Sequence, residues 1–410
     1  MASLSLPPLS LYVHLPWCRA KCPYCDFNSH AADTFPAGRY VEALLADLER
    51  ELPMVWGRPV NSVFLGGGTP SLFPAGAIDV LLSGVRSRLR LVPGAEITLE
   101  ANPGAVGAGA FQGFRDAGVT RLSLGVQSFQ DSFLQRLGRV HDGQAARRAI
   151  ESLLRAGFQS WNMDLIFALP GQTADDALED VREALAYAPP HVSLYQLTLE
   201  PGTPFGSHPP AGLPDVDRAA EMEEMLRSTL ETGGLERYEI SAHARPGQTC
   251  WHNRNYWKYG DYLGIGAGAH GKLTVPGQGI WRSRKTSRPE TYMDSALDKC
   301  GSPADGHWVR PEDRPFEFFL NVLRLKHGFD AELFELRTGL PFLEVEGKLR
   351  QAEKQGLLRR EGRSWRPTPM GLNWHNELCL RFLPEDSGKG PGNGNARAFQ
   401  SLPMDSTHGL

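Results

Sequence analysis

The hydrophobic positions of the first 200 residues follow two periods in turn. Short runs rich in β-branched and aromatic residues, bounded by Gly, Pro and Asn, predict strands. These runs are 9–15, 62–65, 96–100, 121–126, 160–167 and 191–199. Most are separated by stretches with helical spacing, as in 39–52, where Leu44, Leu48 and Leu52 fall on one face. Strand and helix therefore alternate six times, which predicts parallel βα units.

Two of the predicted helices carry their own end signals. The helix predicted over 142–157 starts at Asp142, an N-cap residue type, and ends at a C-cap glycine. The helix predicted over 173–188 starts with Thr173 and Asp176, a capping-box pattern with Asp in place of Glu or Gln. Six βα units are too few to close an eight-stranded barrel. We therefore expect an α/β fold built as a partial, open (β/α)6 barrel, in preference to a doubly wound sheet.

The pattern changes after residue 200. A helix is predicted at 217–232 and a strand at 238–243, followed by an aromatic- and Gly-rich stretch over 250–295. A mostly helical segment then extends to about residue 383, with a hairpin-like stretch at 356–369 and a last helix near 372–383. We expect four parts: a barrel core (1–200), a barrel extension (201–310), a small C-terminal domain (311–384) and a Gly-rich, disordered tail (385–410).

The composition of the 410 residues is that of an ordinary globular protein, with 41% hydrophobic and 22% charged residues. The formal net charge of −4 argues against a general binder of nucleic acid or of anionic membranes. No apolar run approaches the ~18 residues that a membrane-spanning helix needs. The first 17 residues lack Lys and Arg and contain three prolines, unlike a secretory signal or a transit peptide. We expect a cytoplasmic protein with no integral membrane segment.

Three of the six cysteines fall within eight residues. Cys18, Cys22 and Cys25 follow the first predicted strand, and the others (Cys250, Cys300, Cys379) are scattered singly. This is no disulfide framework, so metal or redox chemistry is indicated. Three thiolates from one loop can bind three irons of a [4Fe–4S] cube and leave the fourth iron open. The alternative is a zinc site completed by His14 or His30.

Further polar residues fall where the predicted strands end. Gly66–Pro70 ends the second strand, Glu100 the third, and Gln127 with Ser128 the fourth, while Asp164 lies on the fifth. Enzymes on βα barrels place their chemistry at the carboxyl ends of the strands. Each residue alone has an ordinary structural explanation. Their coincidence on one edge, together with the thiol loop, favours a shared site.

The residues of the thiol loop carry a family resemblance. The segments 12–18 (YVHLPWC) and 22–29 (CPYCDFNS) resemble the radical S-adenosylmethionine (SAM) proteins, and most closely the branch around oxygen-independent coproporphyrinogen III oxidase. Supporting motifs are 66–72, 99–104, 123–129, 137–142 and 164–172, and the resemblance covers roughly 9–383. It implies a radical-SAM barrel with a [4Fe–4S] cluster and SAM as cofactors, and with a reductant such as a flavodoxin-type donor as a partner.

The resemblance also assigns residues. It implies that Cys18, Cys22 and Cys25 hold the cluster, whose open iron would chelate SAM. It implies that Gly67, Gly68 and Thr69 contact the methionyl part, that Tyr12 and Tyr24 flank the cofactor, and that Glu100 accepts from its amino or ribose groups. Gln127, Arg139 and Asp164 match positions that help to bind a second SAM in the oxidase. The resemblance further implies electron transfer that cleaves the sulfonium to a 5′-deoxyadenosyl radical.

Two departures separate the chain from the oxidase. Phe27 stands where the oxidase has a fourth cysteine, and the long N-terminal extension of the oxidase has no counterpart before Tyr12. Both features resemble HemW, a related family of haem chaperones that is not credited with the oxidase activity.

A third motif points to the same family. Residues 250–257 (CWHNRNYW) contain His-Asn-x-x-Tyr-Trp, which is linked to haem binding in HemW proteins. His252 could supply an axial nitrogen, and the neighbouring aromatic rings a flat wall for the macrocycle. The other interpretation is an aromatic core with a hydrogen-bonded histidine. His270 and Cys250 are rival ligands.

The C-terminal segment resembles the small domain of the oxidase family and has a winged-helix pattern. Residues 312–367 hold 11 Lys or Arg and 10 Asp or Glu, so no basic stripe indicates DNA binding. We expect it to pack over the barrel mouth or against a partner. The G-x-G-x-x-G at 266–271 precedes a predicted strand rather than a helix, so it does not predict a phosphate site.

The sequence leaves two main functional hypotheses. The first is a haem chaperone that binds haem and transfers it to an acceptor protein, on a radical-SAM scaffold. The second is an oxidase-like enzyme of porphyrin biosynthesis that decarboxylates coproporphyrinogen III. Phe27 and the His252 motif favour the first, and whether the chain is an enzyme is left open.

Overall fold

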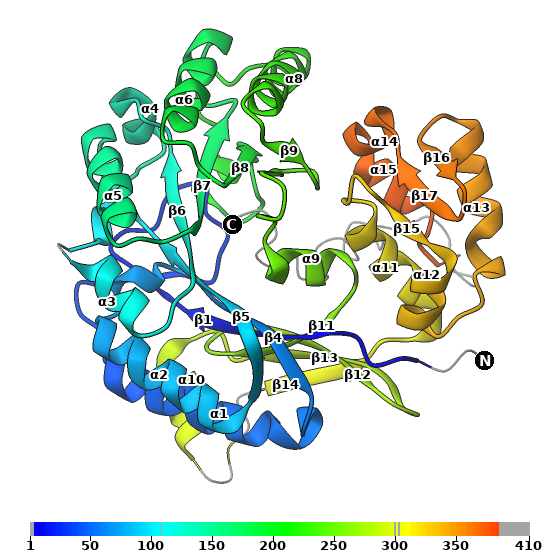
Figure 1. Ribbon diagram of the computed structural model, residues 1–410, viewed down its shortest axis with the longest axis horizontal. Helices are drawn as coiled ribbons and strands as arrows, with labels where there is room; N and C mark the ends of the chain where they lie inside the picture. Colours follow the sequence, from blue (N-terminus) through cyan, green and yellow to red (C-terminus); the bar gives the residue numbers. More distant parts are fainter. Residues whose placement is uncertain (1–3, 108, 299–300, 302–303, 385–410) are drawn as a thin grey trace.

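The computed structural model describes residues 4–107, 109–298, 301 and 304–384. In this part of the chain, one mixed sheet of twelve strands forms an open, curved wall (Figure 1). Its strand order is β14-β13-β12-β11-β1-β4-β5-β6-β7-β8-β10-β9. The predicted open (β/α) barrel is confirmed, because the sheet ends in two separate edges rather than closing on itself. The predicted disorder of 385–410 lies outside the described residues.

Parallel strands make the centre of the sheet. They are β1 (Leu9–Leu15), β4 (Pro59–Gly67), β5 (Arg90–Ala101), β6 (Arg121–Gln127), β7 (Ser160–Phe167), β8 (His191–Gln196) and β11 (Asp261–Ile265). Six were predicted, and the seventh, β11, pairs in parallel with β1 in the register Leu9↔Asp261. Because β11 comes from a distant part of the sequence, no local pattern could indicate that pairing.

Antiparallel strands extend the sheet at both edges. Beyond β8 lie β10 (Ala242–Ala244) and β9 (Glu236–Arg237), and beyond β11 lie β12 (His270–Val275), β13 (Gly279–Lys285) and β14 (Ala304–Trp308). The strand predicted at 238–243 is wrong in its position. The Glu239 carboxylate accepts hydrogen bonds from the backbone N–H and the hydroxyl of Ser241, which fixes a turn where the strand was expected.

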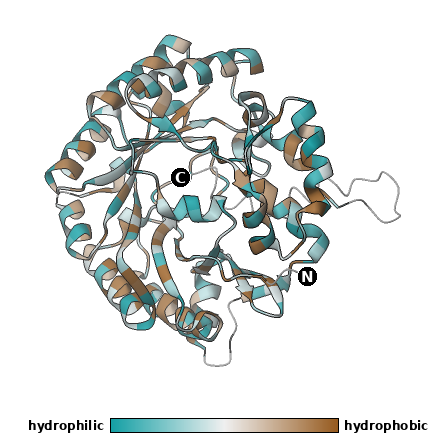
Figure 2. Cartoon of the chain, turned by 45° about the vertical axis from the view of Figure 1, so that its right-hand side comes forward, coloured by the Kyte–Doolittle hydropathy of each residue, from teal (hydrophilic) through white to brown (hydrophobic). Residues whose placement is uncertain are grey.

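Amphipathic helices cover the outer side of the sheet. They are α1 (Ala37–Val55), α2 (Ala75–Arg88), α3 (Ala110–Asp116), α4 (Asp131–Arg136), α5 (Gly143–Arg155), α6 (Ala174–Ala186), α8 (Val216–Thr232) and α10 (Pro289–Leu297). The short α7 (Pro204–Ser207) lies instead against the thiol loop, where the Phe205 N–H donates to the backbone oxygen of Pro23. Short 3-10 turns, η1 (Pro70–Leu72) and η2 (Pro103–Ala105), follow β4 and β5. The mixed teal and brown of these helices in Figure 2 is typical of one buried and one solvated face.

The helix ends predicted from local signals are confirmed. Asp142 caps α5 by accepting from the backbone N–H of Ala145, and Thr173 with Asp176 forms a complete capping box at α6. The main core lies between these helices and the sheet, so that aliphatic side chains such as Leu11, Leu65 and Leu124 are fully buried. No helix among the described residues is long and apolar enough to cross a membrane.

A small C-terminal unit stands beside the barrel (Figure 1). It contains η3 (Pro311–Asp313), α11 (Arg314–Val322), α12 (Ala331–Thr338), α13 (Leu343–Lys354), α14 (Pro369–Asn373), α15 (His375–Leu380) and the sheet of β15 (Phe329–Asp330), β17 (Ser364–Pro367) and β16 (Leu358–Glu361). Three helices followed by a hairpin match the winged-helix expectation. The single helix predicted near 372–383 is two short helices that meet at Trp374.

The C-terminal unit packs against one more helix, α9 (Trp251–Trp257), which lies on the inner side of the sheet. The Arg324 guanidinium lies 4.3 Å from the centre of the Trp257 ring and bonds the Glu239 carboxylate at 3.1 Å. The Arg282 guanidinium on β13 bonds the Glu317 carboxylate on α11 at 2.8 Å. These buried contacts fix the unit beside α9.

We predict that Tyr40→Phe lowers the free energy of unfolding by about 1–3 kcal/mol. The Tyr40 hydroxyl is fully buried, donates to the backbone oxygen of His14 and accepts from the backbone N–H of Ala267, so its loss leaves both groups unpaired. Urea unfolding followed by circular dichroism measures this effect. Tyr187→Phe, at a partly exposed tyrosine, is the control and should change stability by less than ~0.5 kcal/mol. Equal urea midpoints for Tyr40→Phe and Tyr187→Phe would contradict the stabilising role assigned to the two hydrogen bonds of Tyr40.

Candidate functional site

A cavity opens at the carboxyl ends of the parallel strands. Its lining comes from the loop after β1, from residues 68–70 after β4, and from the ends of β5, β6, β7 and β8. Its volume is about 1070 Å³, including the mouth that opens to solvent. In the described part of the chain, no side chain of the C-terminal unit lines it, and packing of this unit over the mouth or against a partner stays a prediction. The cavity is therefore formed by the carboxyl ends of the strands and the loops that follow them.

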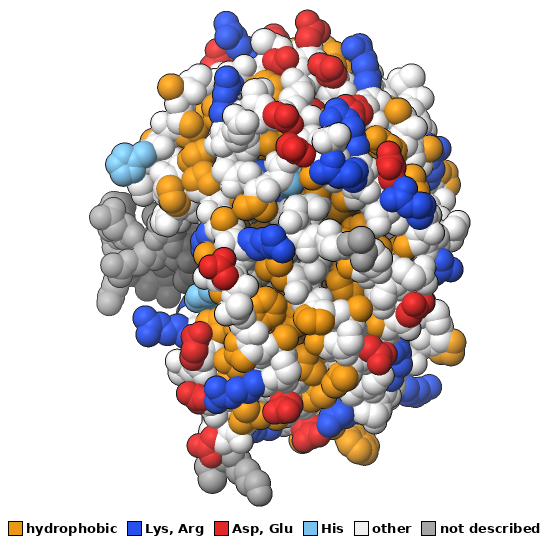
Figure 3. Space-filling model, turned by 90° about the vertical axis from the view of Figure 1, so that its left-hand side faces the viewer, with side chains coloured by type: hydrophobic (Ala, Val, Ile, Leu, Met, Phe, Trp, Pro, Cys, Tyr) orange, Lys and Arg blue, Asp and Glu red, His pale blue; other side chains and the backbone are white. Residues whose placement is uncertain are grey.

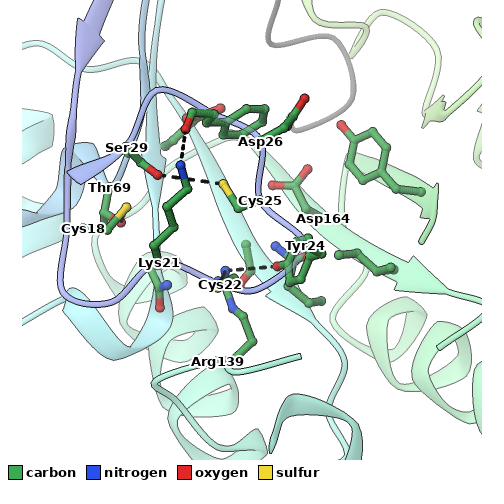
Figure 4. A pocket seen from close by; sticks show the side chains of 18 of the residues that line it. Cys18, Lys21, Cys22, Tyr24, Cys25, Asp26, Ser29, Thr69, Arg139 and Asp164 are labelled. Carbon is green, nitrogen blue, oxygen red and sulfur yellow. Dashed lines mark hydrogen bonds between the residues drawn. The ribbon is translucent and has the colours of Figure 1, made fainter. Parts of the chain in front are cut away.

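The three clustered cysteines face this cavity from one loop (Figure 4). All three thiols are free and partly exposed. The Thr69 hydroxyl donates to the Cys18 sulfur at 3.3 Å, the Cys25 sulfur lies 4.0 Å from the Ser29 hydroxyl, and the Cys22 sulfur lies 3.7 Å from a guanidinium nitrogen of Arg139. Burial raises the pKa of Cys25 to about 11 and that of Cys18 in the same direction.

The donor set fits an iron–sulfur cube better than a single zinc ion. Among the described residues, no three His, Cys, Asp or Glu side chains are gathered closely enough to hold one metal ion. A cube accepts this spacing because each thiolate binds a different iron. His14, one expected zinc ligand, has both ring nitrogens engaged, with the Tyr12 hydroxyl at 3.0 Å and the backbone oxygen of Asn28 at 2.8 Å.

Two glycines after β4 are required by the fold itself. Gly67 has φ of +110°, and a Cβ atom there would lie 2.5 Å from the His14 ring. A Cβ atom on Gly68 would lie 2.6 Å from the backbone oxygen of Trp17. Side chains are therefore excluded because the end of β4 approaches the thiol loop. Of the residues expected to contact SAM here, Gly68 and Thr69 line the cavity, and the Gly67 N–H donates to the Glu100 carboxylate at 3.1 Å.

Two carboxylates line the cavity, the half-buried Glu100 and the buried Asp164. Burial raises the pKa of Glu100 well above its ordinary value, and the nearby charge of Asp164 raises it further. Burial also raises the pKa of Asp164 to about 6, against hydrogen bonds from Asn162 and Ser123 that lower it. Arg121 lies 3% exposed beneath them, and its positive charge lowers both pKa values. Perturbed carboxylates in a cleft are typical of functional sites.

Several polar atoms at the cavity are buried without a hydrogen-bond partner. They are Glu100 Oε1, Gln127 Oε1 and Arg139 Nε. Gln127 also has φ of +67°, a strained conformation for a residue other than glycine. Arg139 donates to the backbone oxygen of Gly125 at 2.9 Å and lies 3.5 Å from the Tyr24 hydroxyl. A polar ligand such as SAM, with its amino, carboxylate and ribose groups, would satisfy these atoms.

The structure does not bring every predicted residue to the cavity. Tyr24 lines it, but Tyr12 points into the barrel, where its ring stacks on Phe64 with centroids 6.3 Å apart. His270, at the start of β12, also lies outside the lining, and burial lowers its pKa to about 3. The roles proposed for these residues stay predictions.

The motif at 250–257 forms the N-cap and the whole of α9, which lies on the inner side of the sheet (Figure 1). The Glu96 carboxylate on β5 accepts from the Cys250 thiol at 3.4 Å and from the backbone N–H groups of Trp251 and His252 at 3.1 Å. The His252 side chain is 1% exposed, and its Nδ1 lies 2.9 Å from the Ser62 hydroxyl. Residues 250–252 therefore lie at the amino end of the barrel, away from the cavity.

Sequence reasoning missed the polar residues beneath the cavity. Arg121, Ser123, Asn162 and His191 all point inward from β6, β7 and β8, and all are buried. These polar residues alternate with apolar residues along strands that the sequence predicted to be buried. That alternation was the available signal for a polar interior, because every second residue of a strand faces the same side. The cavity wall at 195–198 and Glu200, after β8, carried no recognisable motif.

The face of the molecule in Figure 3 carries Lys and Arg interspersed with Asp and Glu, and neither sign forms a continuous stripe there. This distribution resembles the surface of an ordinary globular protein.

The chain matches two family models. Residues 12–184 match the radical SAM superfamily, and residues 309–374 match the HemN C-terminal domain. The first covers the thiol loop and the ends of β4, β5, β6 and β7 at the cavity, but not β8. The second covers most of the C-terminal unit.

The chain is similar over nearly its whole length to curated relatives. It is 46% identical to "Heme chaperone HemW" of Escherichia coli over 383 residues, which cover 93% of this chain and 100% of that protein. It is 44% identical to the Haemophilus influenzae protein of the same name, with 93% and 99% covered. It is 34% identical to mouse "Radical S-adenosyl methionine domain-containing protein 1, mitochondrial", with 92% and 87% covered.

A solved structure has the same fold. Coproporphyrinogen III oxidase (HemN) from Escherichia coli, described as a radical SAM enzyme, superposes with a TM-score of 0.77. The match covers 92% of this chain and 90% of that one at 22% identity. This likeness establishes the architecture and carries no argument about the reaction.

We predict that Asp164→Asn raises the free energy of unfolding at pH 7.5 by about 1–3 kcal/mol. The folded-state pKa of Asp164, about 6, lies above its ordinary value, so protonation stabilises the fold at low pH and that stability is lost as the pH rises through 6. The advantage of the variant should therefore shrink towards pH 4.5, as measured by urea midpoints at both pH values.

The control for this prediction is Asp142→Asn, at an exposed helix N-cap that Asn satisfies equally well. Its effect should be small at both pH values. An Asp164→Asn variant that is less stable than the wild type at pH 7.5 would show that the charged carboxylate is part of the structural framework.

Proposed function

The chain belongs to the HemW family, and from that membership we propose that it is a haem chaperone, which binds haem and transfers it to an acceptor protein. The observation that supports this most strongly is the 46% identity over the full length of the Escherichia coli relative named a haem chaperone. The scaffold for this function is the radical-SAM barrel, with a [4Fe–4S] cluster and SAM as its cofactors.

The cluster would be held by Cys18, Cys22 and Cys25, and when bound it would supply the electrons for reductive cleavage of SAM. The chain itself provides a cation beside the thiols, because Arg139 lies against Cys22 and is locked by the backbone of Gly125. Burial raises the pKa of Cys18, and the nearby positive charge of Arg139 lowers it. A reductant of the flavodoxin type is the proposed electron donor.

SAM would bind along the cavity wall. Gly68 and Thr69 on one side and Tyr24, Gln127 and Arg139 on the other line the same cavity as the thiols. Glu100 and Asp164 on the floor offer carboxylate oxygens to amino and hydroxyl groups. We propose that the core (1–200) carries these cofactors, the extension (201–310) the haem motif, and the C-terminal domain (311–384) the packing beside α9.

His252 is the proposed axial ligand for haem. The Ser62 hydroxyl donates to Ser10 Oγ at 2.9 Å and so accepts from Nδ1–H of His252, which leaves the lone pair on Nε2. Nε2 is buried without a partner, and burial lowers the pKa of His252 to about 3, so the ring stays in the neutral form that binds metals. Because the side chain is 1% exposed, α9 must move before haem can reach it.

The second candidate function is the decarboxylation of coproporphyrinogen III. The match of residues 309–374 to the HemN C-terminal domain supports it. Phe27, which lines the cavity where the oxidase is expected to have a cysteine, weighs against it. Consumption of coproporphyrinogen III by the reconstituted protein with SAM and a reductant would establish this activity.

We predict that Cys22→Ser abolishes the cluster. Its sulfur is one of three that face the cavity, and two thiolates cannot anchor a site-differentiated cube. Anaerobic reconstitution followed by iron and sulfide analysis and by visible absorption measures the loss. Cys250→Ser is the control, because that thiol is buried against Glu96 away from the cavity and should leave the cluster intact. Full iron loading of Cys22→Ser would refute the ligand assignment.

We predict that His252→Ala weakens haem binding by at least about tenfold and alters the Soret band, because the axial nitrogen is lost. Haemin titration of the anaerobically reconstituted protein measures both. Ser62→Ala is the matched control, since it removes the hydrogen bond that holds the ring but keeps the ligand. It should bind haem at least as tightly as the wild type. An unchanged Soret band and affinity in His252→Ala would transfer the ligand role to His270 or Cys250.

A further inference from the structure

A network of buried hydrogen bonds lies directly beneath Asp164, one of the residues labelled at the cavity in Figure 4. Asn162 is at its centre, two residues before Asp164 on β7, so both side chains point to the same face of the sheet. The amide nitrogen of Asn162 donates to Asp164 Oδ1 and to the Ser123 hydroxyl, both at 2.7 Å. The amide oxygen lies 2.6 Å from Nδ1 of His191 and accepts from the Ser193 hydroxyl at 3.1 Å. Asn162 therefore makes all four hydrogen bonds that an amide side chain can form.

The far side of the network determines which way the Asn162 amide faces. If the amide were rotated by half a turn, its oxygen would face the Asp164 carboxylate, and two acceptors would repel each other. The observed orientation therefore needs donors at the amide oxygen, and Nδ1–H of His191 is one of them. The Tyr238 hydroxyl, 2.9 Å from Nε2, donates to it and so keeps the His191 proton on Nδ1. Burial lowers the pKa of His191 and raises that of Tyr238, each well beyond its ordinary value, so the ring stays neutral and the hydroxyl keeps its proton.

The near side of the network leaves Asp164 with free capacity towards the cavity. Asn162 donates to Oδ1, and the Ser123 hydroxyl donates to Oδ2 at 3.1 Å, so each carboxylate oxygen keeps a lone pair for a ligand. No salt bridge among the described residues engages this carboxylate. An ionised carboxylate can only accept hydrogen bonds, so Asp164 favours ligand groups that donate or that carry a positive charge.

The charge of Asp164 depends on a balance of opposing effects. Burial raises its pKa to about 6, and the hydrogen bond from Asn162 lowers it. The charged or titratable groups that face it are Arg121 on β6, Glu100 on β5 and Tyr195 on β8. Near neutral pH, the loss of one hydrogen bond is therefore enough to change the fraction of Asp164 that is ionised.

We infer that Asn162 and His191 are positioning residues that keep the Asp164 carboxylate ionised and directed at a donor group of the ligand in the cavity. This inference rests on the proposed function for the identity of that ligand, SAM, which carries an amino group, a sulfonium and ribose hydroxyls. His191 fixes the Asn162 amide, and the amide N–H stabilises the charged carboxylate more than the neutral acid. Neither residue lines the cavity, so both act on the ligand through Asp164.

His191→Leu and His191→Asn are the pair of variants that tests this inference. Both remove the ring and its bond to Tyr238, but the amide of Asn can place an N–H close to the position of Nδ1, whereas Leu has no donor. His191→Leu should therefore raise the pKa of Asp164, and His191→Asn should restore it. Ser193→Ala removes the other donor to the same amide oxygen and is a milder variant with the same expected direction. His243→Leu, at a histidine of β10 that is also almost fully buried but lies outside the network, is the control for the loss of a buried imidazole.

The first measurement is the SAM affinity of the anaerobically reconstituted full chain at pH 6.0 and at pH 8.5. We expect His191→Leu to bind SAM about fivefold more weakly than the wild type at pH 6.0, and equally well at pH 8.5, where Asp164 is ionised in both. His191→Asn and His243→Leu should follow the wild type at both pH values. A purely structural role of His191 would weaken binding by the same factor at both pH values, and that result would overturn the inference.

A carbon-13 NMR titration of the Asp164 carboxyl group in the full chain provides a readout that needs no ligand. The spectrum of Asp164→Asn identifies the signal. Its midpoint should move to higher pH in His191→Leu and, by a smaller amount, in Ser193→Ala. An unchanged midpoint in both variants would refute the inference and leave the proposed function intact. If the midpoint moves but the wild type binds no SAM at either pH, the positioning role stands and SAM falls as the cofactor.

Discussion

The parallel pairing of β1, β4, β5, β6, β7 and β8 is the constraint on which the rest of the molecule depends. Parallel strands bring their carboxyl ends to one edge, so the thiol loop, the two glycines, Glu100, Gln127 and Asp164 meet although they are spread over 150 residues of sequence. The βα connections also place the helices on the outer side of the sheet, so that other residues occupy its inner side. The side chains on that inner side are largely polar, which is unusual for the centre of a domain.

The polar interior has an energetic cost, because its side chains are removed from water. Glu100 and Asp164 are buried close to each other, and the fold holds them with pKa values raised by burial rather than neutralised by an ion pair. Buried ion pairs do occur elsewhere in the chain, such as Lys285 with Asp47 at 2.7 Å and Lys272 with Asp261 at 3.0 Å, and these join elements of the framework. The contrast separates structural charges, which are paired, from those at the cavity, which face an open space.

The position of α9 changes the meaning of the His-Asn-x-x-Tyr-Trp motif. His252 contacts Ser62, Asn255 donates to Ser10 Oγ at 3.0 Å, and Trp257 receives Arg324 of the C-terminal unit. The motif therefore joins the barrel to that unit as well as carrying the proposed haem ligand. A substitution in it alters packing and ligation together, so loss of haem binding alone does not identify the ligand. Variants that remove a hydrogen-bond partner and keep the imidazole separate the two effects.

The sequence by itself determined the features that depend on neighbouring residues. Strands 9–15 and 160–167, the caps at Asp142 and Thr173, and the thiol loop were all predicted, because periodicity, capping and ligand spacing act within a few residues. Only the tertiary structure decided that β11 pairs with β1, that 238–241 turns, that α9 is buried, and that Asn162, His191 and Tyr238 form one chain. Strand pairing and burial are set by contacts between residues far apart in sequence, and no local pattern records which distant partner a side chain will meet.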